Sequence, residues 1–257
     1  MQALGTPGLS ARGARLRRPP FHWPRLCELC RSWAPQSLCA ACLLRFAAEQ
    51  PRCEGCALPL GSPGQRCGDC LREPPPFTRC ITLADYHYPW DGLITAFKFR
   101  GRIDLAGPLA HALAQRLARQ PVLDANLVLP VPLSPSRLAE RGHNQAWEVA
   151  RRVATALALP ADAGILLRLR DTAHQVGLAR SERERNLRDA FWVEPPRTSR
   201  VSGRHVALVD DVFTTGATAA AASRALLTAG AASVQLWVLA RTPRPDEQAS
   251  GTQQIDR

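Results

Sequence analysis

Apolar residues beyond position 77 alternate between short continuous runs and longer segments with helical spacing. The short runs, which are typical of buried strands, span residues 80–88, 126–133, 164–170, 203–211 and 233–241. The longer segments, in which apolar residues recur every three or four positions, span residues 91–101, 104–120, 144–159 and 216–230. Because strands alternate with helices along the chain, this pattern predicts an α/β fold with a doubly wound, mostly parallel sheet.

Polar and proline-rich stretches divide the chain into four parts. The sequence REPPPF at residues 72–77 separates a cysteine-rich part, residues 25–73, from a large domain, residues 77–243. Residues 1–24 are basic and residues 244–257 are polar, and neither part has apolar periodicity. We therefore expect a disordered basic tail at the start of the chain and a loose tail at its end.

The composition adds a strong excess of positive charge to this picture. The net charge is +11, and Lys98 is the only lysine, so nearly all of the positive charge is arginine. Arginine suits anionic ligands and nucleic acid, although a GC-rich coding sequence would produce the same bias. No apolar run approaches the ~20 residues of a membrane helix, and no apolar core of a secretory signal follows the first arginines. We expect a cytoplasmic protein without membrane insertion.

The segment VALVDDVFTTGAT, residues 206–218, combines an apolar strand, two acids and a small hydroxyl-rich turn. Asp210 and Asp211 stand at the predicted carboxyl end of the strand, where open α/β sheets bind ligands. The turn leads into a predicted helix, whose first N–H groups and dipole attract a phosphate. Carboxylates repel phosphate but accept hydrogen bonds from a sugar diol. The two halves together therefore predict a ligand that carries a ribose 5-phosphate.

Each part of this segment also has a structural interpretation. Paired acids can solvate the edge of a sheet, and threonine is an ordinary helix cap. The combination of an apolar strand, two acids, a turn and a helix favours a binding site over these separate roles. The segment is not a Walker loop, because no GK[ST] sequence is present.

The same segment closely resembles the phosphoribosyl pyrophosphate (PRPP) motif of type I phosphoribosyltransferases. The resemblance implies that Asp210 and Asp211 bind the ribose hydroxyls. It also implies that five residues cradle the 5-phosphate: Thr214, Thr215, Gly216, Ala217 and Thr218. The pyrophosphate of such a ligand carries dense negative charge, so we expect Mg²⁺ to accompany it.

More of the chain resembles the ComF/GntX-type branch of these proteins. The segments LADYHYPWDGLITAFKFRGRIDLAGPLA, VPLSPSRLAERGHNQA and HQVGLARSERERNLRDAF precede the PRPP motif in the order seen in that family. The similarity covers residues 27–241, including the cysteine-rich start. It implies a type I phosphoribosyltransferase-like fold with an N-terminal double zinc ribbon. It also implies a part in natural competence or DNA uptake.

Further residues are candidates for contact with phosphate or with an acceptor. In the segment RLAERGHNQ the candidates are Arg137, Arg141, Asn144 and Gln145. Lys98 is another candidate, because a compact ammonium group can reach a phosphate, although an ordinary surface position explains it equally well. The polar excursion at residues 172–187 resembles the flexible hood that closes over the reacting groups, with a solvated charged loop as the alternative. Its matches to the family pattern are Gln175, Arg183 and Asn186.

Eight of the nine cysteines form CxxC pairs, an arrangement that presents two thiolates to one tetrahedral zinc ion. The pairs are Cys27/Cys30, Cys39/Cys42, Cys53/Cys56 and Cys67/Cys70. The short gaps within each half predict two structural zinc sites of four thiolates each. A crossed pairing of the first and third pairs stays open, as do disulfides. The ninth, Cys80, is predicted to be a buried strand residue.

Two functions fit these features. The first is an enzyme that transfers the phosphoribosyl group of PRPP to an unknown acceptor, with catalysis by positioning and electrostatics and with no catalytic residue identified. The second is a non-catalytic PRPP sensor that binds single-stranded DNA and works with proteins of the competence machinery. If phosphate contacts dominate its DNA binding, the affinity falls steeply with salt.

Overall fold

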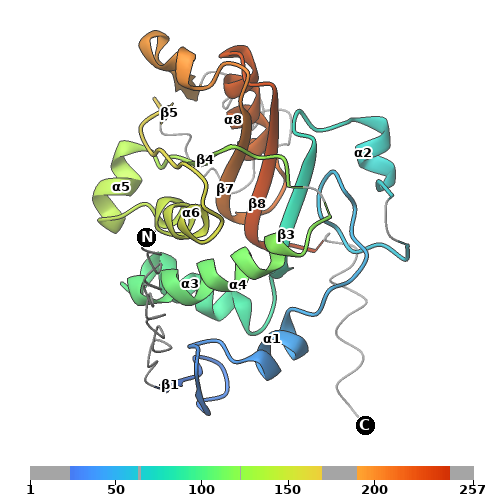
Figure 1. The fold of residues 1–257 in the computed structure, drawn as a ribbon, viewed down its shortest axis with the longest axis vertical. Coiled ribbons are helices and arrows are strands. Elements are labelled where there is room, and N and C mark those ends of the chain that lie inside the picture. The colour runs from blue at the N-terminus through green and yellow to red at the C-terminus, as the bar shows by residue number, and fades with distance from the viewer. Residues whose placement is uncertain (1–23, 63–64, 122, 170–189, 244–257) are drawn as a thin grey trace, which may run out of the picture.

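A four-stranded sheet, whose strands are all parallel, forms the centre of the molecule (Figure 1). The structure is a computed structural model that describes residues 24–62, 65–121, 123–169 and 190–243. The strands are, in spatial order, β3 (Arg79–Asp85), β8 (Ser233–Arg241), β7 (His205–Phe213) and β4 (Leu127–Pro130). The parallel α/β sheet predicted from the alternation of strands and helices is confirmed.

Both faces of the central strands are buried, which explains their nearly continuous apolar sequences. Val206 and Leu208 of β7 belong to the core on one face of the sheet. Ala207 and Val209 belong to the core on the other face, as the two-residue alternation of a strand requires. The sheet therefore separates two apolar cores, each of which needs its own cover of helices.

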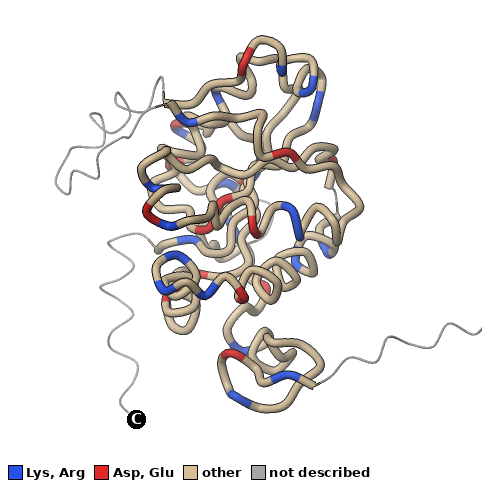
Figure 2. The backbone as a smooth tube through the Cα atoms, turned by 90° about the vertical axis from the view of Figure 1, so that its left-hand side faces the viewer, with Lys and Arg blue, Asp and Glu red and all other residues tan. Residues whose placement is uncertain are grey.

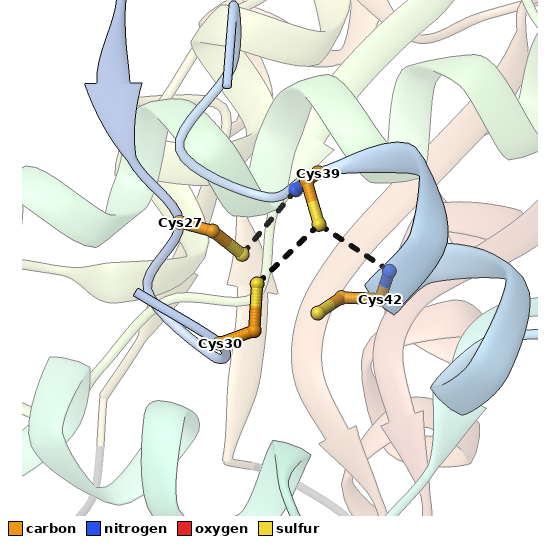
Figure 3. A group of neighbouring side chains, drawn as sticks. All are labelled: Cys27, Cys30, Cys39 and Cys42. Carbon is orange, nitrogen blue, oxygen red and sulfur yellow. Dashed lines mark hydrogen bonds between the residues drawn. The ribbon is translucent and has the colours of Figure 1, made fainter. Parts of the chain in front are cut away.

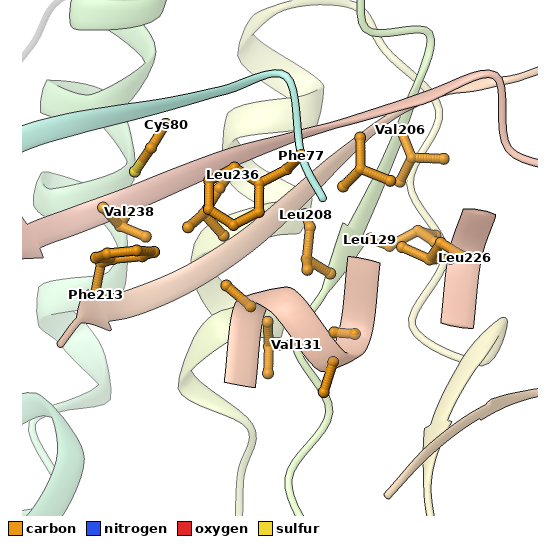
Figure 4. Packing of buried hydrophobic residues seen from close by; sticks show 14 of the residues in the cluster. Phe77, Cys80, Leu129, Val131, Val206, Leu208, Phe213, Leu226, Leu236 and Val238 are labelled. Atoms are coloured by element: carbon orange, nitrogen blue, oxygen red, sulfur yellow. The ribbon is translucent and has the colours of Figure 1, made fainter. Parts of the chain in front are cut away.

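One face is covered by α3 (Trp90–Phe99), α4 (Ala106–Ala118) and α6 (Gln145–Ala156) (Figure 1). The other face is covered by α8 (Ala217–Thr228) and by a small antiparallel sheet of β5 (Leu166–Arg168) and β6 (Phe191–Val193). Figure 4 shows this second core, in which Leu226 of α8 lies near Leu208 and Leu129 of the sheet. The helices predicted at residues 91–101, 104–120, 144–159 and 216–230 are all present.

The cysteine-rich part contributes to both cores. Its elements are β1 (Arg25–Leu26), β2 (Trp33–Ala34), α1 (Ala40–Phe46) and α2 (Gly68–Arg72). Leu38 and Leu43, from the first half, pack into the core that α4 covers. Cys53 and Cys56, from the second half, belong to the opposite core together with Phe77. The two halves of this part therefore contact different faces of the sheet.

Sequence and structure differ mainly at element ends and in short elements. β7 continues through both acids to Phe213, because its backbone stays paired with β8 as far as Arg241. A parallel ladder uses backbone groups only, so a loss of apolar character does not mark its end. In the described part of the large domain, α5 (Pro135–Arg141), β6 and the 3-10 helix η2 (Pro195–Arg200) had no predicting pattern. The 3-10 helix η1 (Ile103–Leu105) overlaps the start of the helix predicted at residues 104–120.

Several predicted features lie in residues that the structure does not describe. The hood expected at residues 172–187 lies beyond the described residues, as do both expected tails apart from Pro24. Cys80 is a buried residue of β3, as predicted. In the described ranges no helix has the length and apolar character needed to cross a bilayer.

Candidate functional site

The two acids of the PRPP-like motif lie near the carboxyl end of β7 in different surroundings. Asp211 is buried on the side of the sheet that α3 and α6 cover. Asp210 is half-buried, and the alternation of side chains along a strand places it on the opposite side. The backbone N–H of Asp211 donates to Oδ1 of Asp210 at 2.8 Å. The structure thus brings both carboxylates to the end of one strand but gives them different partners.

Asp211 is held by one side chain from each of two helices. Nζ of Lys98, in the last turn of α3, lies 2.8 Å from Oδ1 of Asp211. Nε2 of Gln145, the first residue of α6, donates to Oδ2 of Asp211 at 2.7 Å. A largely buried carboxylate needs such a cation and donor to remain charged. Lys98 and Gln145, which the sequence suggested as ligand contacts, are therefore engaged with the second acid of the motif.

Asp210, the first acid of the pair, has a raised pKa. Burial raises the pKa of Asp210 from 3.8 to about 7, and the negative charge of Asp211 adds to the rise. The cations Lys98 and Arg168 act in the opposite direction, and they do not cancel it. Sequence reasoning gave Arg168, the last residue of β5, no role. Near pH 7, Asp210 can therefore offer a hydroxyl ligand either an acceptor or a protonated carboxyl group.

The turn after β7 has a backbone that only glycine can complete. Gly216 has a φ of +83°, and a Cβ atom there would lie 2.6 Å from Cζ of Phe213. The helix α8 then begins at Ala217, with Gly216 at its N-cap, and Oγ1 of Thr215 accepts from the N–H of Ala217 at 3.5 Å. Its first N–H groups have no acceptor within the helix, which is the arrangement that binds phosphate at helix starts. The remaining residues of the motif are exposed or half-buried: Thr214, Thr215, Ala217 and Thr218.

The segment between α5 and α6 lies next to this end of the sheet. Asn144 caps α6, since its Oδ1 accepts from the N–H groups of Ala146 and Trp147, and its Nδ2 donates to the carbonyl of Val131 at 3.1 Å. Both polar atoms of Asn144 thus hold the loop in place. Arg137 is half-buried on α5. Three other candidates, Gln175, Arg183 and Asn186, lie outside the described residues.

Three buried polar atoms of this segment have no hydrogen-bond partner among the described residues. They are Nε of Arg141, Nε2 of His143 and Oε1 of Gln145. Buried polar atoms are normally paired with protein or water, so these atoms are open to a water molecule or a ligand. The guanidinium of Arg141 also lies 4.7 Å from the ring centre of Phe99, which is 62% exposed.

Arg241, at the end of β8, is a residue that the sequence analysis missed. Its side chain is buried, and its Nη1 donates to the carbonyl of Thr214 at 2.8 Å, at the turn between β7 and α8. Its Nε donates to the carbonyl of Cys56 at 2.9 Å. The signal in the sequence was a single cation that ends an otherwise apolar central strand, beside the strand that carries the acids.

The eight paired cysteines form two clusters of four. Within each cluster, the sulfur atoms all lie within 4.8 Å of one another, and the members are Cys27, Cys30, Cys39 and Cys42 in one and Cys53, Cys56, Cys67 and Cys70 in the other. Figure 3 shows the first cluster, in which the side chains from the two knuckles face a common centre. The crossed pairing left open by the sequence is therefore not the arrangement found.

The chemistry of the clusters fits a bound divalent cation. Backbone N–H groups point at sulfur atoms, as in the 3.2 Å contact from Cys67 N to Cys53 Sγ. Burial opposes ionisation of Cys53, but the N–H groups of Cys67 and Cys56 outweigh it and lower its pKa to about 7. Burial, together with the charges of Cys53 and Cys67, raises the pKa of Cys56 to about 12. Four thiolates repel one another in this way unless a cation neutralises them.

The net positive charge does not by itself mark one surface. In Figure 2 the Lys and Arg positions are spread over helices and loops and are interspersed with Asp and Glu. Several arginines are paired on the surface, as Arg102 is with Asp104 and Glu28. A nucleic-acid interface therefore has to be sought in local features rather than in the overall charge.

The chain is similar to one protein family and to several named bacterial proteins. A family model described as phosphoribosyl transferase domain matches residues 106–253. The chain is 37% identical over 228 residues to DNA utilization protein YhgH of Escherichia coli (strain K12), covering 85% of this chain and 98% of that protein. It is 33% identical over 180 residues to competence protein F of Haemophilus influenzae, covering 68% of this chain and 77% of that protein.

Among solved structures, glutamine phosphoribosylpyrophosphate amidotransferase from B. subtilis aligns with 56% of this chain and 30% of that chain. The sequence identity is 21% and the TM-score is 0.39. The structural likeness is therefore only partial.

The raised pKa of Asp210 predicts a pH-dependent stability. Between pH 3.8 and about 7 the folded protein keeps a proton that the unfolded chain releases, so stability from this residue falls as the pH rises through that window. We expect Asp210→Asn to lose this dependence and to gain stability over the parent as the pH increases. Urea unfolding midpoints of both proteins between pH 5 and 8 measure the difference.

The exposed acid Asp104 provides the control, because its pairing with Arg102 lowers its pKa and keeps its titration out of this range. Asp104→Asn should follow the pH trend of the parent. Parallel curves for the parent and Asp210→Asn would contradict a raised pKa.

Proposed function

The chain belongs to the ComF family, which is built on a phosphoribosyl transferase domain, and from this premise we propose that it binds PRPP at the carboxyl end of β7. One observation carries the proposal: two carboxylates at the end of a central parallel strand lead directly into a glycine-dependent turn and the start of a helix whose N-cap is that glycine. This juxtaposition offers acceptors for a diol next to donors for a phosphate.

The ribose hydroxyls bind the acids in this proposal. Asp210, the more accessible of the two, accepts from one hydroxyl. Each oxygen of Asp211 accepts one bond from Lys98 or Gln145, which leaves lone pairs for a second hydroxyl. Lys98 and Gln145 thus hold Asp211 in position rather than binding the phosphate themselves.

The 5-phosphate binds the turn that follows. The N–H groups at the start of α8 and the hydroxyls of Thr214, Thr215 and Thr218 supply the donors. Mg²⁺, when bound with the ligand, supplies the charge that neutralises the pyrophosphate. The proposed reaction is pentosyl transfer, in which an acceptor bonds to the anomeric carbon while the bond to pyrophosphate breaks and pyrophosphate leaves. The protein contributes by positioning and electrostatics.

We extend the proposal to DNA uptake, with competence proteins as partners. The support is the similarity to proteins named DNA utilization protein YhgH and competence protein F. The cysteine clusters are assigned to two structural zinc ions, because zinc prefers four tetrahedral thiolates and the sulfur atoms are already grouped in fours.

A second activity, binding of single-stranded DNA, is favoured by one surface feature. Phe99 is 62% exposed at the end of α3, and the guanidinium of Arg141 lies 4.7 Å from its ring centre. An exposed aromatic ring stacks on bases of any sequence, and an arginine beside it can contact phosphate. Phe99 follows Lys98, which reaches Asp211, so a strand stacked there would pass close to the PRPP site.

The PRPP site is tested by changing both acids. Each hydrogen bond to a charged group contributes about 1.5–3 kcal/mol, so we expect Asp210→Asn with Asp211→Asn to lower the affinity for PRPP and Mg²⁺ by more than ~100-fold. Isothermal titration calorimetry measures the affinity, and pyrophosphate release with candidate acceptors then separates a transferase from a sensor. Asp104→Asn, which changes an exposed acid, should bind PRPP like the parent. Unchanged binding in the double variant would place the ligand elsewhere.

Metal analysis tests the cysteine clusters. Two sites of four thiolates require about two zinc ions per folded chain. We expect a strong chelator to remove them and to lower the melting temperature, and added zinc to restore it. Protein that is purified with reducing agent present throughout and still holds no zinc would refute the assignment.

The DNA surface is tested by removing the exposed ring. Stacking on an aromatic side chain contributes about 1–3 kcal/mol per base, so Phe99→Ala should weaken binding of single-stranded DNA by about 5- to 100-fold. The control is Trp192→Ala, because Trp192 is also exposed but lies on β6. Fluorescence anisotropy at increasing salt should show affinity that falls with ionic strength. Equal effects of the two variants, or a salt-independent affinity, would count against this surface.

A further inference from the structure

Arg241 connects the phosphate-binding turn to the second cysteine cluster. Its guanidinium is buried, with only 7% of the residue exposed, and it donates in two directions. Nη1 donates to the carbonyl of Thr214 at 2.8 Å and to that of Phe213 at 3.2 Å. Nε donates to the carbonyl of Cys56 at 2.9 Å. One planar side chain therefore bridges two segments that are far apart in the sequence.

On the side of the turn, Arg241 also fixes an aromatic ring. The guanidinium lies 4.7 Å from the ring centre of Phe213, in a cation–π arrangement. That ring occupies the space where Gly216 would carry a Cβ atom. The positions of Phe213 and of the Thr214 carbonyl decide where the chain enters the turn. They therefore decide where the N–H groups at the start of α8 point.

On the other side, Arg241 contacts a segment whose shape depends on the cysteine cluster. The carbonyl of Cys56 belongs to the knuckle in which the carbonyl of Cys53 accepts from the N–H of Ala57 at 2.8 Å. Gly55 packs so closely that a Cβ atom there would lie 2.9 Å from Sγ of Cys70. A knuckle of this kind keeps its shape only while its thiolates share a cation.

The first cluster has no comparable connection. Its neighbours contact α4 and η1, through Arg116, which donates to the carbonyl of Ala47, and through the pair of Arg102 with Glu28. Within the described ranges, no hydrogen bond joins the first cluster to the turn at residues 213–218. The two clusters therefore differ in their relation to the proposed ligand site.

We propose that Arg241 is a positioning residue that transmits the geometry of the second cysteine cluster to the phosphate-binding turn, so that metal in the second cluster, and not in the first, sets the affinity for PRPP. The proposal rests on the function proposed above. Arginine is needed for this role because its rigid fork reaches carbonyl groups in two directions at once, whereas a lysine presents a single point charge.

The test compares two buried arginines in the full-length, metal-loaded chain. Arg241→Lys keeps the charge but removes the fork, and it should weaken PRPP binding at least about tenfold, since small displacements of a binding group have large effects. Arg116→Lys is the matched control, because Arg116 is similarly buried, at 8% exposed, but serves the first cluster. It should bind PRPP within about twofold of the parent. Calorimetry gives the affinities, and metal analysis confirms equal loading.

A second pair of variants separates the two clusters. Cys56→Ser and Cys30→Ser each change the second cysteine of a knuckle, and each should release about one metal ion. Only Cys56→Ser should weaken PRPP binding. Should Cys56→Ser not fold, hydrogen exchange in the absence of PRPP gives the same comparison for the arginine variants. The amide groups of Ala220 and Thr242, which donate to the carbonyls of Gly216 and Phe213, should exchange faster in Arg241→Lys than in Arg116→Lys.

The outcomes distinguish this inference from the function on which it rests. A parent protein that does not bind PRPP overturns the proposed function. A parent that binds PRPP, with Arg241→Lys binding equally well and with unchanged exchange at Ala220 and Thr242, overturns the role of Arg241 alone. Equal losses in Cys30→Ser and Cys56→Ser would show that metal stabilises the whole fold without any route through Arg241.

Discussion

The parallel pairing of β7 with β8 determines where the two acids and Arg241 lie relative to one another. Because the two strands run in the same direction and stay paired as far as Phe213 and Arg241, their carboxyl ends meet at one edge of the sheet. That edge carries Asp210 and Asp211 on one strand and the buried guanidinium of Arg241 on the next. A shift of one residue in this register would reverse the facing of each side chain and separate the acids from their partners.

Charge balance explains why neighbouring acids can persist at a largely buried strand end. Asp211 is paired with Lys98 and receives a hydrogen bond from Gln145. Burial beside a charged neighbour favours the protonated form of Asp210, and the cations Lys98 and Arg168 do not cancel this effect. The pair therefore carries less negative charge than two free carboxylates would, which suits the proposed binding of a polyphosphate ligand.

The cysteine-rich part is more closely integrated with the sheet than a tethered module would be. Its first half packs under α4, and the thiols of its second half belong to the same core as Phe77 and α8. Any cation in the second cluster would therefore stabilise the large domain as well as the knuckles. Arg241 links this packed core to the turn after β7, because it donates hydrogen bonds to the carbonyls of Cys56 and Thr214.

The sequence by itself determined the parallel α/β fold, the helices and long strands, the acid-and-turn motif and the grouping of cysteines into pairs. These features depend on local periodicity, on short motifs and on glycine at Gly216, which one chain segment specifies alone. Only the tertiary structure decided that Lys98 and Gln145 hold Asp211, that Asn144 is a helix cap, and that Arg241 reaches both Cys56 and Thr214. It also decided the uncrossed pairing of the cysteines. These contacts join residues that are distant along the chain, and their partners are set by packing across the sheet, which no local pattern encodes.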